Sequence, residues 1–590
     1  MLKDNTIIKT FTFVLGVLSQ REKIKALFVL LLLFINSCAE VLGLAALLPL
    51  FKLLLEPNFV ETNEYVNYLF ESFNFGSSMD FIIFICILVV VIFLGKNTLS
   101  LFILNYQSKF ALGLSKKLGM KLHLLFHSYG YGFFKNNSSH KISHNVNVVT
   151  QRFAQNQVLG LINLLNEIVV FSIMVMGIAL YDANILLLIL CTIVPVFLFF
   201  YGLIRKKIIK MGQEYNTINP KLFKDIYQSI FGYVDVLITG TLNNFRSKIG
   251  EGLSSLVRIN VKRTVYNRAP TKVIEMALVT TICLIVVYST VYRKDISSTT
   301  TLLGVFAVSG YRILPSVNRI MIALMGLKEN EYTFEVLGQL KYASNHIQKA
   351  EEQNTITFND KIEANNIHYC YDDSDKSVLN GLTFSVKKGE IIGVIGPSGS
   401  GKSTLLNLLL GFYYPTKGTI KIDGINLDKT TVSNFHKKVG YVQQQVYLID
   451  GTIAENIAFG LKASAIDEAK VNEVLKQASL EEFVRTLNLG IHTPIGENGT
   501  KLSGGQRQRV GIARALYHNA EILFFDEATS ALDTETEEEI TEAINKLNDG
   551  NITMFIVAHR VSTLKNCSRI FEMDKGLIIH ELSYSNIRTK

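Results

Sequence analysis

Long apolar stretches in the first 330 residues most constrain what this chain can fold into. A run of about 20 mostly apolar residues is long enough to cross a bilayer as a helix, and within lipid a single segment satisfies its own backbone hydrogen bonds only as a helix. Such runs cover residues 26–50, 81–105, 158–181, 185–204, 273–292 and 300–325. We therefore predict a six-span, all-α membrane domain over residues 1–330.

The remaining residues have a different character. The chain has 590 residues, enough for more than one domain. Its 48% hydrophobic and 18% charged composition averages two unlike halves. Residues 331–360 are polar and include Glu351 and Glu352. We expect a linker there, followed by a soluble α/β domain over residues 361–590.

The net charge of +9 is concentrated near the predicted spans. Lys and Arg are frequent before the first span, between spans two and three, and between spans four and five, whereas residues 51–80 contain only Lys52. Cytoplasmic loops carry this excess, so we expect a multi-pass membrane protein with both termini cytoplasmic. The same explanation makes a nucleic-acid partner unnecessary.

The cysteines and the N-terminus suggest no further site. Four of the six cysteines fall within apolar runs and none form a C-x-x-C pair, so we expect no disulfide framework and no cysteine metal site. The first residues lack the small-residue cleavage site of a signal peptide.

A glycine-rich stretch, GPSGSGKST, follows the apolar run 391–395 and precedes a predicted helix. Glycines let backbone N–H groups point at phosphate oxygens, and the helix N-terminus adds partial positive charge. In this pattern the lysine reaches the β- and γ-phosphates and the next hydroxyl binds Mg²⁺. The predicted phosphate-binding residues are Gly396, Pro397, Ser398, Gly399, Ser400, Gly401, Lys402, Ser403 and Thr404.

Two later stretches define a family resemblance. Residues 502–506 read LSGGQ, and residues 522–527 read ILFFDE, an apolar strand that ends in two carboxylates. Together with the phosphate loop they resemble the ATP-binding cassette (ABC) transporters. The resemblance implies an ABC ATPase of the P-loop fold, with ATP and Mg²⁺ as cofactors.

The resemblance also implies roles for individual residues. Tyr371 would stack on adenine, Gln444 and Asp526 would join Ser403 at Mg²⁺, and Glu527 would be the general base. Gln443 stands where the family usually has proline, so Gln443 and Gln445 remain alternatives to Gln444. The catalytic residues implied are Glu527, His559, Gln444 and Lys402.

In the same family the LSGGQ motif of one cassette closes over ATP bound to another. Ser503, Gly504, Gly505 and Gln506 would therefore act on the ATP of a second chain. One cassette and six spans make half a transporter, so we expect a homodimer, with a heterodimer as the alternative.

The long loops resemble those of ABC exporters, in which short coupling helices dock on the ATPase domain. By this resemblance they would lie near residues 138–146 and 226–232, unless these are plain solvent loops. Residues 61–75 place Val66, Leu69, Phe70 and Phe73 on one helical face. We expect an external amphipathic helix that lies on the membrane or caps the bundle.

Ionisable residues inside spans are costly and need a reason. Arg312 and Arg319 are two helical turns apart on either side of Pro315, which should kink the helix, and Lys96 lies in the second span. They could form a basic cavity surface that binds a substrate anion, or they could pair with acidic residues in other spans. The acidic residues available are Glu40, Glu167 and Glu275.

Residues 311–320 also resemble the sixth span of the lipid-linked oligosaccharide flippases of bacterial protein glycosylation. That resemblance implies a polyisoprenyl-pyrophosphate oligosaccharide as substrate. Lys96 stands where those flippases have an arginine, which puts the substrate in doubt. The alternatives are an exporter of peptides, drugs or lipid A, an importer, or a non-transport ABC ATPase.

Overall fold

The computed structural model describes residues 6–47, 50, 53, 64–73, 75–181, 183–288, 315–340, 356–371, 376–527, 537–539, 541–542, 544, 551–558 and 560–587. They belong to two compact units. The first comprises Met1–His127 and Asn136–Ala343, and the second comprises Ser128–Lys135 and Ser344–Lys590. The predicted combination of an all-helical membrane domain and an α/β domain is confirmed.

Long helices form the first unit. Three segments of the described residues are long and apolar enough to cross a membrane: Gln20–Gly43, Met79–Ser128 and Ser139–Leu180. The predicted fourth and fifth spans fall largely within two further helices, α11 and α13, and the sixth is described only from residue 315. The main helices are α1 (Thr6–Val17), α2 (Gln20–Ala45), α6 (Ser78–Ser128), α10 (Leu159–Tyr181), α11 (Ala183–Phe231) and α13 (Leu242–Tyr288).

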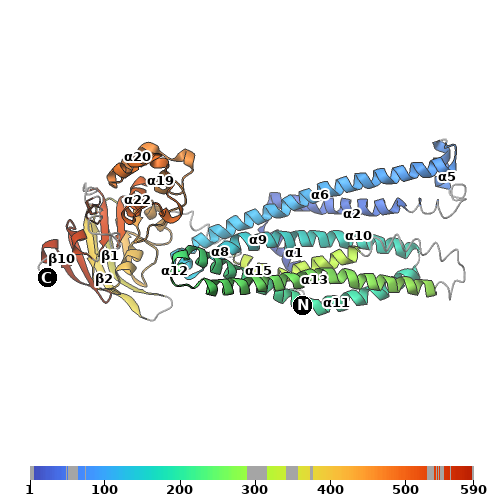
Figure 1. Cartoon of the computed structure of the whole chain (residues 1–590), viewed down its shortest axis with the longest axis horizontal. Helices are drawn as coiled ribbons and strands as arrows, with labels where there is room; N and C mark the ends of the chain where they lie inside the picture. The colour runs from blue at the N-terminus through green and yellow to red at the C-terminus, as the bar shows by residue number, and fades with distance from the viewer. Residues whose placement is uncertain are drawn as a thin grey trace. The chain divides into compact units, whose positions relative to one another are not determined.

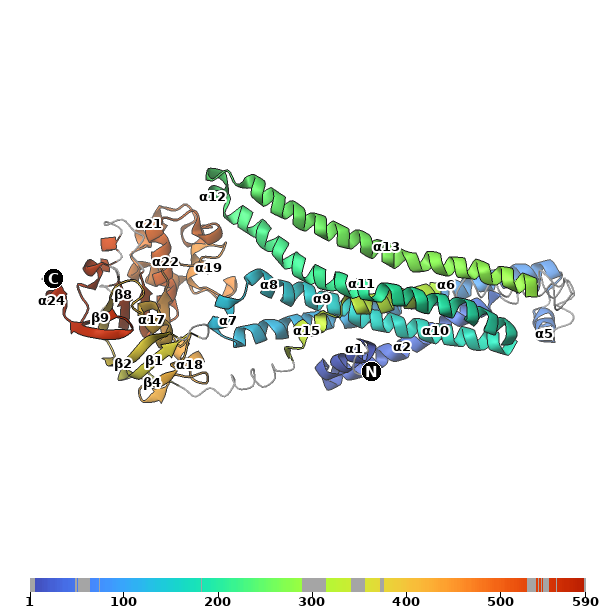
Figure 2. The ribbon, with the colours of Figure 1, turned by 90° about the horizontal axis from the view of Figure 1, so that it is seen from below.

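The helices pack through small apolar clusters. α11 and α13 lie side by side in Figures 1 and 2, and α10 packs on α2. Ile193 of α11, Ile274 of α13 and Val317 are buried together. Many other large apolar side chains of these helices are exposed, which suits surfaces that face lipid.

The helix that leads into α10 is wound more widely than an α-helix. It comprises α8 (Ser139–His144), the π-turn η2 (Asn145–Val149), α9 (Thr150–Arg152) and a second π-turn, η3 (Phe153–Val158). Within η3, buried Gln157 accepts a hydrogen bond from Thr10 at 2.9 Å and donates one to the Leu327 carbonyl at 2.7 Å. These contacts hold α1 and the region after the sixth span against the bundle.

The short helices between the long ones lie a few residues from the expected positions. α7 spans Tyr131–Asn136, whereas the expected segment 138–146 forms the start of the third long helix. α12 spans Tyr233–Ile238, whereas the expected segment 226–232 is mostly the end of α11. Gly130 has a φ of +78° and ends α6, so it places the break before residue 131.

A helix, α5 (Glu64–Ser72), lies within the segment where the external helix is predicted. Val66 and Phe70 pack against buried Phe81 of α6 and against Leu53. Phe73, which was expected on the same face, is 58% exposed. At least part of the apolar face therefore contacts the helix bundle, as a cap would.

Two sheets build the second unit (Figure 1). The four-stranded sheet has the order β2-β1-β4-β5, and its pairs are antiparallel. The six-stranded sheet has the order β10-β9-β3-β8-β7-β6 and is parallel except for β10. The strands are β1 (Lys361–Cys370), β2 (Ser377–Lys387), β3 (Ile391–Ile395), β4 (Lys417–Ile422), β5 (Ile425–Asn426), β6 (Val439–Val442), β7 (Ile522–Asp526), β8 (Thr553–Val557), β9 (Arg569–Asp574) and β10 (Leu577–Leu582).

β3, β7 and β8 are almost fully buried, as expected for apolar strands of a parallel sheet. Helices pack around them, and their apolar faces form two clusters on either side of the sheet. The helices are α17 (Lys402–Leu409), α18 (Val432–His436), α19 (Ile453–Ile457), α20 (Glu468–Gln477), α21 (Glu481–Thr486), α22 (Gly504–Tyr517) and α24 (Tyr584–Ile587), while α15 (Thr333–Leu337) belongs to the first unit.

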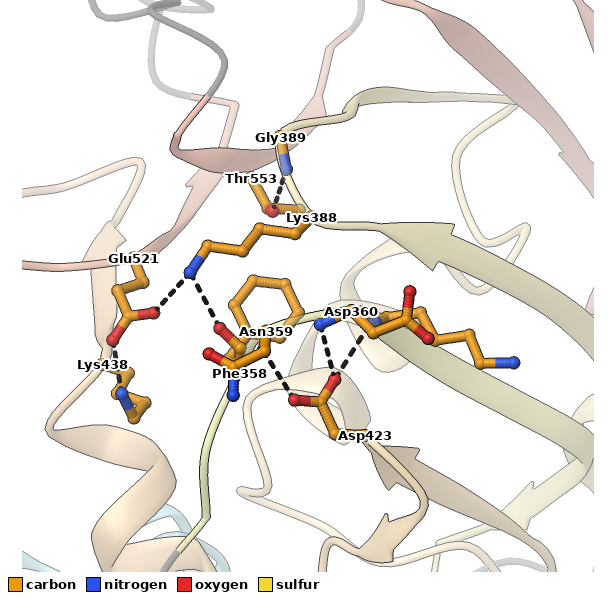
Figure 3. A network of polar contacts seen from close by, with 10 residues as sticks. Phe358, Asn359, Asp360, Lys388, Gly389, Asp423, Lys438, Glu521 and Thr553 are labelled. Carbon is orange, nitrogen blue, oxygen red and sulfur yellow. Dashed lines mark hydrogen bonds and ion pairs between the residues drawn. The ribbon is translucent and has the colours of Figure 1, made fainter.

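A polar network fixes the chain where it enters β1 (Figure 3). The Asp423 carboxylate accepts hydrogen bonds from the backbone N–H groups of Asn359 at 2.6 Å, Asp360 at 2.9 Å and Lys361 at 2.9 Å. Burial raises the pKa of Asp423, but these three donors outweigh it and leave the pKa below its usual value. The carboxylate is thus stabilised in its charged form.

A lysine extends this network into the parallel sheet. Lys388 Nζ donates to the Phe358 carbonyl at 2.8 Å and to Glu521 at 3.0 Å, and Glu521 also pairs with Lys438. The segment that leads out of the linker is therefore tied to both sheets before the first strand begins.

Candidate functional site

The glycine-rich loop lies between the central strand β3 and helix α17. Gly396 has a φ of +149°, and a Cβ there would lie 2.1 Å from the Met573 carbonyl oxygen. No side chain caps α17, whose N-cap residue is Gly401. The loop therefore has a cradle that a side chain would fill, beside the free N–H groups of a helix N-terminus.

Two polar side chains of the loop have the character of an anion site. Lys402 Nζ donates to the carbonyls of Gly396 at 2.8 Å and Pro397 at 3.0 Å, although Lys402 is only 6% exposed. The Ser400 hydroxyl is buried and has no hydrogen-bond partner among the described residues. A buried ammonium and a buried, unsatisfied hydroxyl fit a phosphate group.

Asp526 and Glu527 lie at the carboxyl end of β7, next to β8. Burial raises the pKa of Asp526, and the charge of Glu527 adds to the rise, whereas a hydrogen bond from Tyr441 and the charge of Lys402 oppose it. Asp526, the exposed hydroxyl of Ser403 and the amide of Gln444 are hard oxygen donors of the kind that Mg²⁺ prefers. The donor set therefore fits a magnesium ion.

The backbone at Glu527 is unusual. Its φ is +50°, which is uncommon for a residue with a side chain. Its N–H donates to the Val557 carbonyl at 3.1 Å, and its carboxylate accepts a hydrogen bond from Gln444 Nε2 at 3.2 Å. Strained backbone of this kind is frequent at functional sites.

The predicted residues around the loop lie as follows. The Tyr371 hydroxyl is 3.0 Å from Thr404 Oγ1, so the tyrosine stands beside α17. Ser503 caps α22: its hydroxyl accepts from the Gln506 N–H, and the Gln506 side chain accepts from the Ser503 N–H. Ser503 is exposed, whereas Gly505 is buried. His559 lies outside the described residues.

Two residues of this region were missed by the sequence reasoning. Gln508 of α22 is buried and donates to the carbonyl of Gln444 at 2.6 Å. Tyr441 of β6 donates to Asp526 Oδ2 at 3.3 Å. Gln508 follows the LSGGQ motif closely, which is a weak signal. Nothing near Tyr441 in sequence indicates its partner, which is 85 residues away.

A second candidate site is a cavity of about 410 Å³ in the helical unit. Its wall combines apolar side chains with many amides, and its charges are mixed: Arg263 and Arg319 face three glutamates. The amides are Asn36, Gln107, Gln155, Asn156, Asn163, Asn166 and Asn267, and the glutamates are Glu40, Glu167 and Glu329.

Both arginines of this wall are paired. Arg319 Nε lies 3.0 Å from Glu167, whose side chain is 4% exposed, and Arg263 Nε lies 3.1 Å from Glu329. Lys96 is not in the wall; its ammonium lies over the Phe93 ring. Arg312 lies outside the described residues. Arg319 therefore has the acidic partner that the alternative required, while binding of a substrate anion by Arg312, Arg319 and Lys96 stays a prediction.

Comparison with known proteins agrees with this geometry. The family model described as ABC transporter matches residues 379–530. The whole fold resembles a bacterial Atm1-family ABC exporter solved with ATP bound, at a TM-score of 0.77 and 20% identity over 96% of both chains. Residues 379–530 of this chain are thus similar to the ATPase domains of ABC transporters, and the chain as a whole has the ABC exporter fold.

Relatives that are similar to this chain include proteins named ATP-dependent lipid A-core flippase. The one from Saccharophagus degradans is 41% identical over 269 residues, which is 46% of this chain and 44% of that protein. The one from Bordetella avium is 28% identical over 415 residues, which is 70% of each chain. The match to the first relative thus spans less than half of that protein.

Proposed function

We propose that this chain is an ABC transporter that uses ATP hydrolysis to move an amphipathic lipid from the cytoplasmic to the outer leaflet of the bacterial inner membrane. The observation that carries the ATPase half is the buried ammonium of Lys402 in the loop 396–401, next to the unsatisfied Ser400 hydroxyl. Triphosphate oxygens would replace the backbone carbonyls as partners of Lys402. We keep residues 1–330, 331–360 and 361–590 as membrane domain, linker and ATPase domain.

The residues divide the ATPase chemistry among them. Lys402 and the N–H groups at the start of α17 hold the β- and γ-phosphates, and Tyr371 stacks on adenine. Glu527 accepts the proton of the attacking water, and Gln444 orients that carboxylate through the 3.2 Å hydrogen bond. Ser403, Asp526 and Gln444 would hold Mg²⁺, which neutralises charge on the β- and γ-phosphates. His559 would contact the γ-phosphate.

A second copy completes each site. Ser503 uses its oxygen as an acceptor in the cap of α22, which leaves its O–H free to donate. We propose a homodimer in which Ser503, Gly504, Gly505 and Gln506 of one chain contact the γ-phosphate bound by the other chain. We also propose that both termini lie in the cytoplasm, because the loops on that side are rich in Lys and Arg.

The substrate is proposed from the cavity and the relatives. The names of the relatives favour a lipid, and an amide-rich wall suits the hydroxyl groups of a sugar head group. We therefore propose a glycolipid. Lipid A-core is the first candidate, and a polyisoprenyl-pyrophosphate oligosaccharide is the second, because residues 311–320 favour it in sequence. Two paired arginines facing three glutamates give a pyrophosphate less support than an unpaired basic wall would.

Reconstituted vesicles test this proposal. ATP turnover and lipid translocation would be measured together with lipid A-core and, separately, with a polyisoprenyl-pyrophosphate oligosaccharide. We expect ATP-dependent translocation of one of them, abolished by Glu527→Gln. Turnover without translocation of either lipid would contradict the glycolipid proposal, and turnover unimpaired by Glu527→Gln would remove Glu527 from its role.

A further inference from the structure

A row of three aromatic rings runs through the second unit and ends at Asp526. Tyr131, in α7, stacks on Phe412 with ring centroids 4.7 Å apart and planes 15° apart. Phe412 meets Tyr441 edge to face at 5.9 Å and 70°. The Tyr441 hydroxyl then donates to Asp526 Oδ2 at 3.3 Å. The row thus joins the segment 128–135 to a carboxylate of the nucleotide site.

We propose that Tyr441 is a positioning residue for Asp526, and that the row Tyr131–Phe412–Tyr441 couples the position of α7 to metal binding at the nucleotide site. This rests on the proposed function, in which Asp526 holds Mg²⁺. A hydrogen bond to one oxygen of a metal-binding carboxylate fixes its rotation and leaves the other oxygen for the ion. Packing on Phe412 needs only the ring of residue 441, so the hydroxyl has the separate task of fixing Asp526.

The middle of the row is held firmly in the domain core. Phe412 lies three residues after α17, where the His436 ring nitrogen Nε2 contacts the Leu410 carbonyl at 2.7 Å. Phe412 and Tyr441 both pack on the apolar cluster that contains Leu405 of α17. A shift of Tyr131 against Phe412 would therefore reach both Asp526 and the phosphate-loop helix.

The segment 128–135 makes a second contact beside the same site. The Lys135 ammonium lies 5.4 Å from the centroid of the Tyr371 ring, and Tyr131 meets Tyr413 edge to face at 5.6 Å. Tyr371 itself contacts Thr404 of α17. α7 thus touches aromatic residues on the adenine side of the site as well as the row that leads to Asp526.

Metal and nucleotide binding by the full-length chain test the proposal. In a Glu527→Gln background, which prevents turnover, Mn²⁺ binding with ATP would be measured by EPR, and metal-free ATP binding by fluorescence titration. We expect Tyr441→Phe to weaken Mn²⁺ binding about 10-fold while metal-free ATP binding stays unchanged. Tyr584→Phe, which changes a distant tyrosine of the same domain, is the matched control.

A double-mutant cycle tests the coupling. Tyr131→Ala should also weaken Mn²⁺ binding, and its effect should shrink in a Tyr441→Phe chain because the row is already broken there. Tyr129→Ala, which removes a ring of the same segment that lies 5.0 Å from the Phe133 ring and is not part of the row, should leave Mn²⁺ binding unchanged. Unchanged Mn²⁺ binding in Tyr441→Phe, or strictly additive effects in the cycle, would overturn the proposal. Absence of ATP binding by the parent chain would instead refute the proposed ATPase function.

Discussion

At the scale of single residues, the backbone of the phosphate loop restricts which positions can carry a side chain. Gly396 combines a φ of +149° with a Cβ position 2.1 Å from a carbonyl oxygen, whereas Gly399 has a φ of +82° and open space around its Cβ. Only the first position therefore suffers both backbone strain and a backbone clash.

The two glycines give a matched pair of variants. We expect Gly396→Ala to destabilise the ATPase domain by about 3 kcal/mol and to abolish ATP binding, and Gly399→Ala to cost about 1 kcal/mol. Thermal unfolding of the two purified variants and a nucleotide titration check this. Equal costs at the two positions would show that the clash with Met573 is relieved by movement of the loop.

Variants at Arg319 can distinguish a structural role of this side chain from a role in substrate binding. Because Glu167 is buried beside it, Arg319→Ala should leave an uncompensated carboxylate and destabilise the membrane domain by about 3–5 kcal/mol. The double variant Arg319→Ala/Glu167→Ala should recover much of that loss. The unfolding temperatures of the three proteins in the same detergent measure this. If the double variant is as unstable as the single one, the ion pair is not what holds Arg319 in place.

At the scale of elements, the entry to β1 depends on one carboxylate. Because the folded-state pKa of Asp423 is depressed, its stabilisation is fully present above the unfolded pKa of about 3.9 and is lost as the pH falls through the lower folded value. Asp423→Asn should therefore cost about 1–3 kcal/mol at pH 7.

The pH dependence identifies the charge as the cause. The difference in unfolding free energy between the natural chain and Asp423→Asn should stay constant from pH 7 to pH 5 and shrink below pH 4. Denaturant titrations at several pH values measure it. A difference that persists undiminished in acid would mean that the side chain acts through its shape rather than through its charge.

The sequence predicted the elements that have local signals. Apolar length indicated the spans, and the glycines and Lys402 of the loop indicated a strand, a turn and a helix in the correct order. The short helices were misplaced because their bounds depend on where α6 and α11 stop. Gly130 signals the end of α6. α11 continues through Pro195 and Pro220, so the prolines in its sequence do not indicate where it ends.

The rest of the candidate site depends on contacts between distant residues. Tyr441 reaches Asp526 and Gln508 reaches Gln444 only because β6, β7 and α22 pack together. The pairing of Arg319 with Glu167 also joins separate helices. The sequence offered Glu167 as one of several possible acidic partners for the arginines in the spans, but it could not show which glutamate pairs with Arg319.

At the scale of the whole molecule, the proposed sites are shared between two chains. Lys402→Ala and Ser503→Arg should each abolish ATPase activity in a homodimer, the first by removing the phosphate ligand and the second by blocking the contact in trans. In a mixed dimer of the two variants, one site would combine the natural loop of one chain with the natural LSGGQ motif of the other.

We therefore expect the mixed dimer to regain ATPase activity. The two variants would be co-expressed with different affinity tags and purified through both tags in succession. A dimer purified in the same way that carries both changes in one chain and none in the other has no intact shared site, and it should be inactive. An inactive mixed dimer would contradict shared sites.

The segment 128–135 also has a consequence for how the protein is made. It belongs to the same compact unit as the ATPase residues, yet Phe412 leaves the ribosome about 280 residues after Tyr131. At roughly 5–20 residues per second, Phe412 follows Tyr131 out of the ribosome by on the order of 15–60 s. The contact between Tyr131 and Phe412 can therefore form only after the first 412 residues have been made.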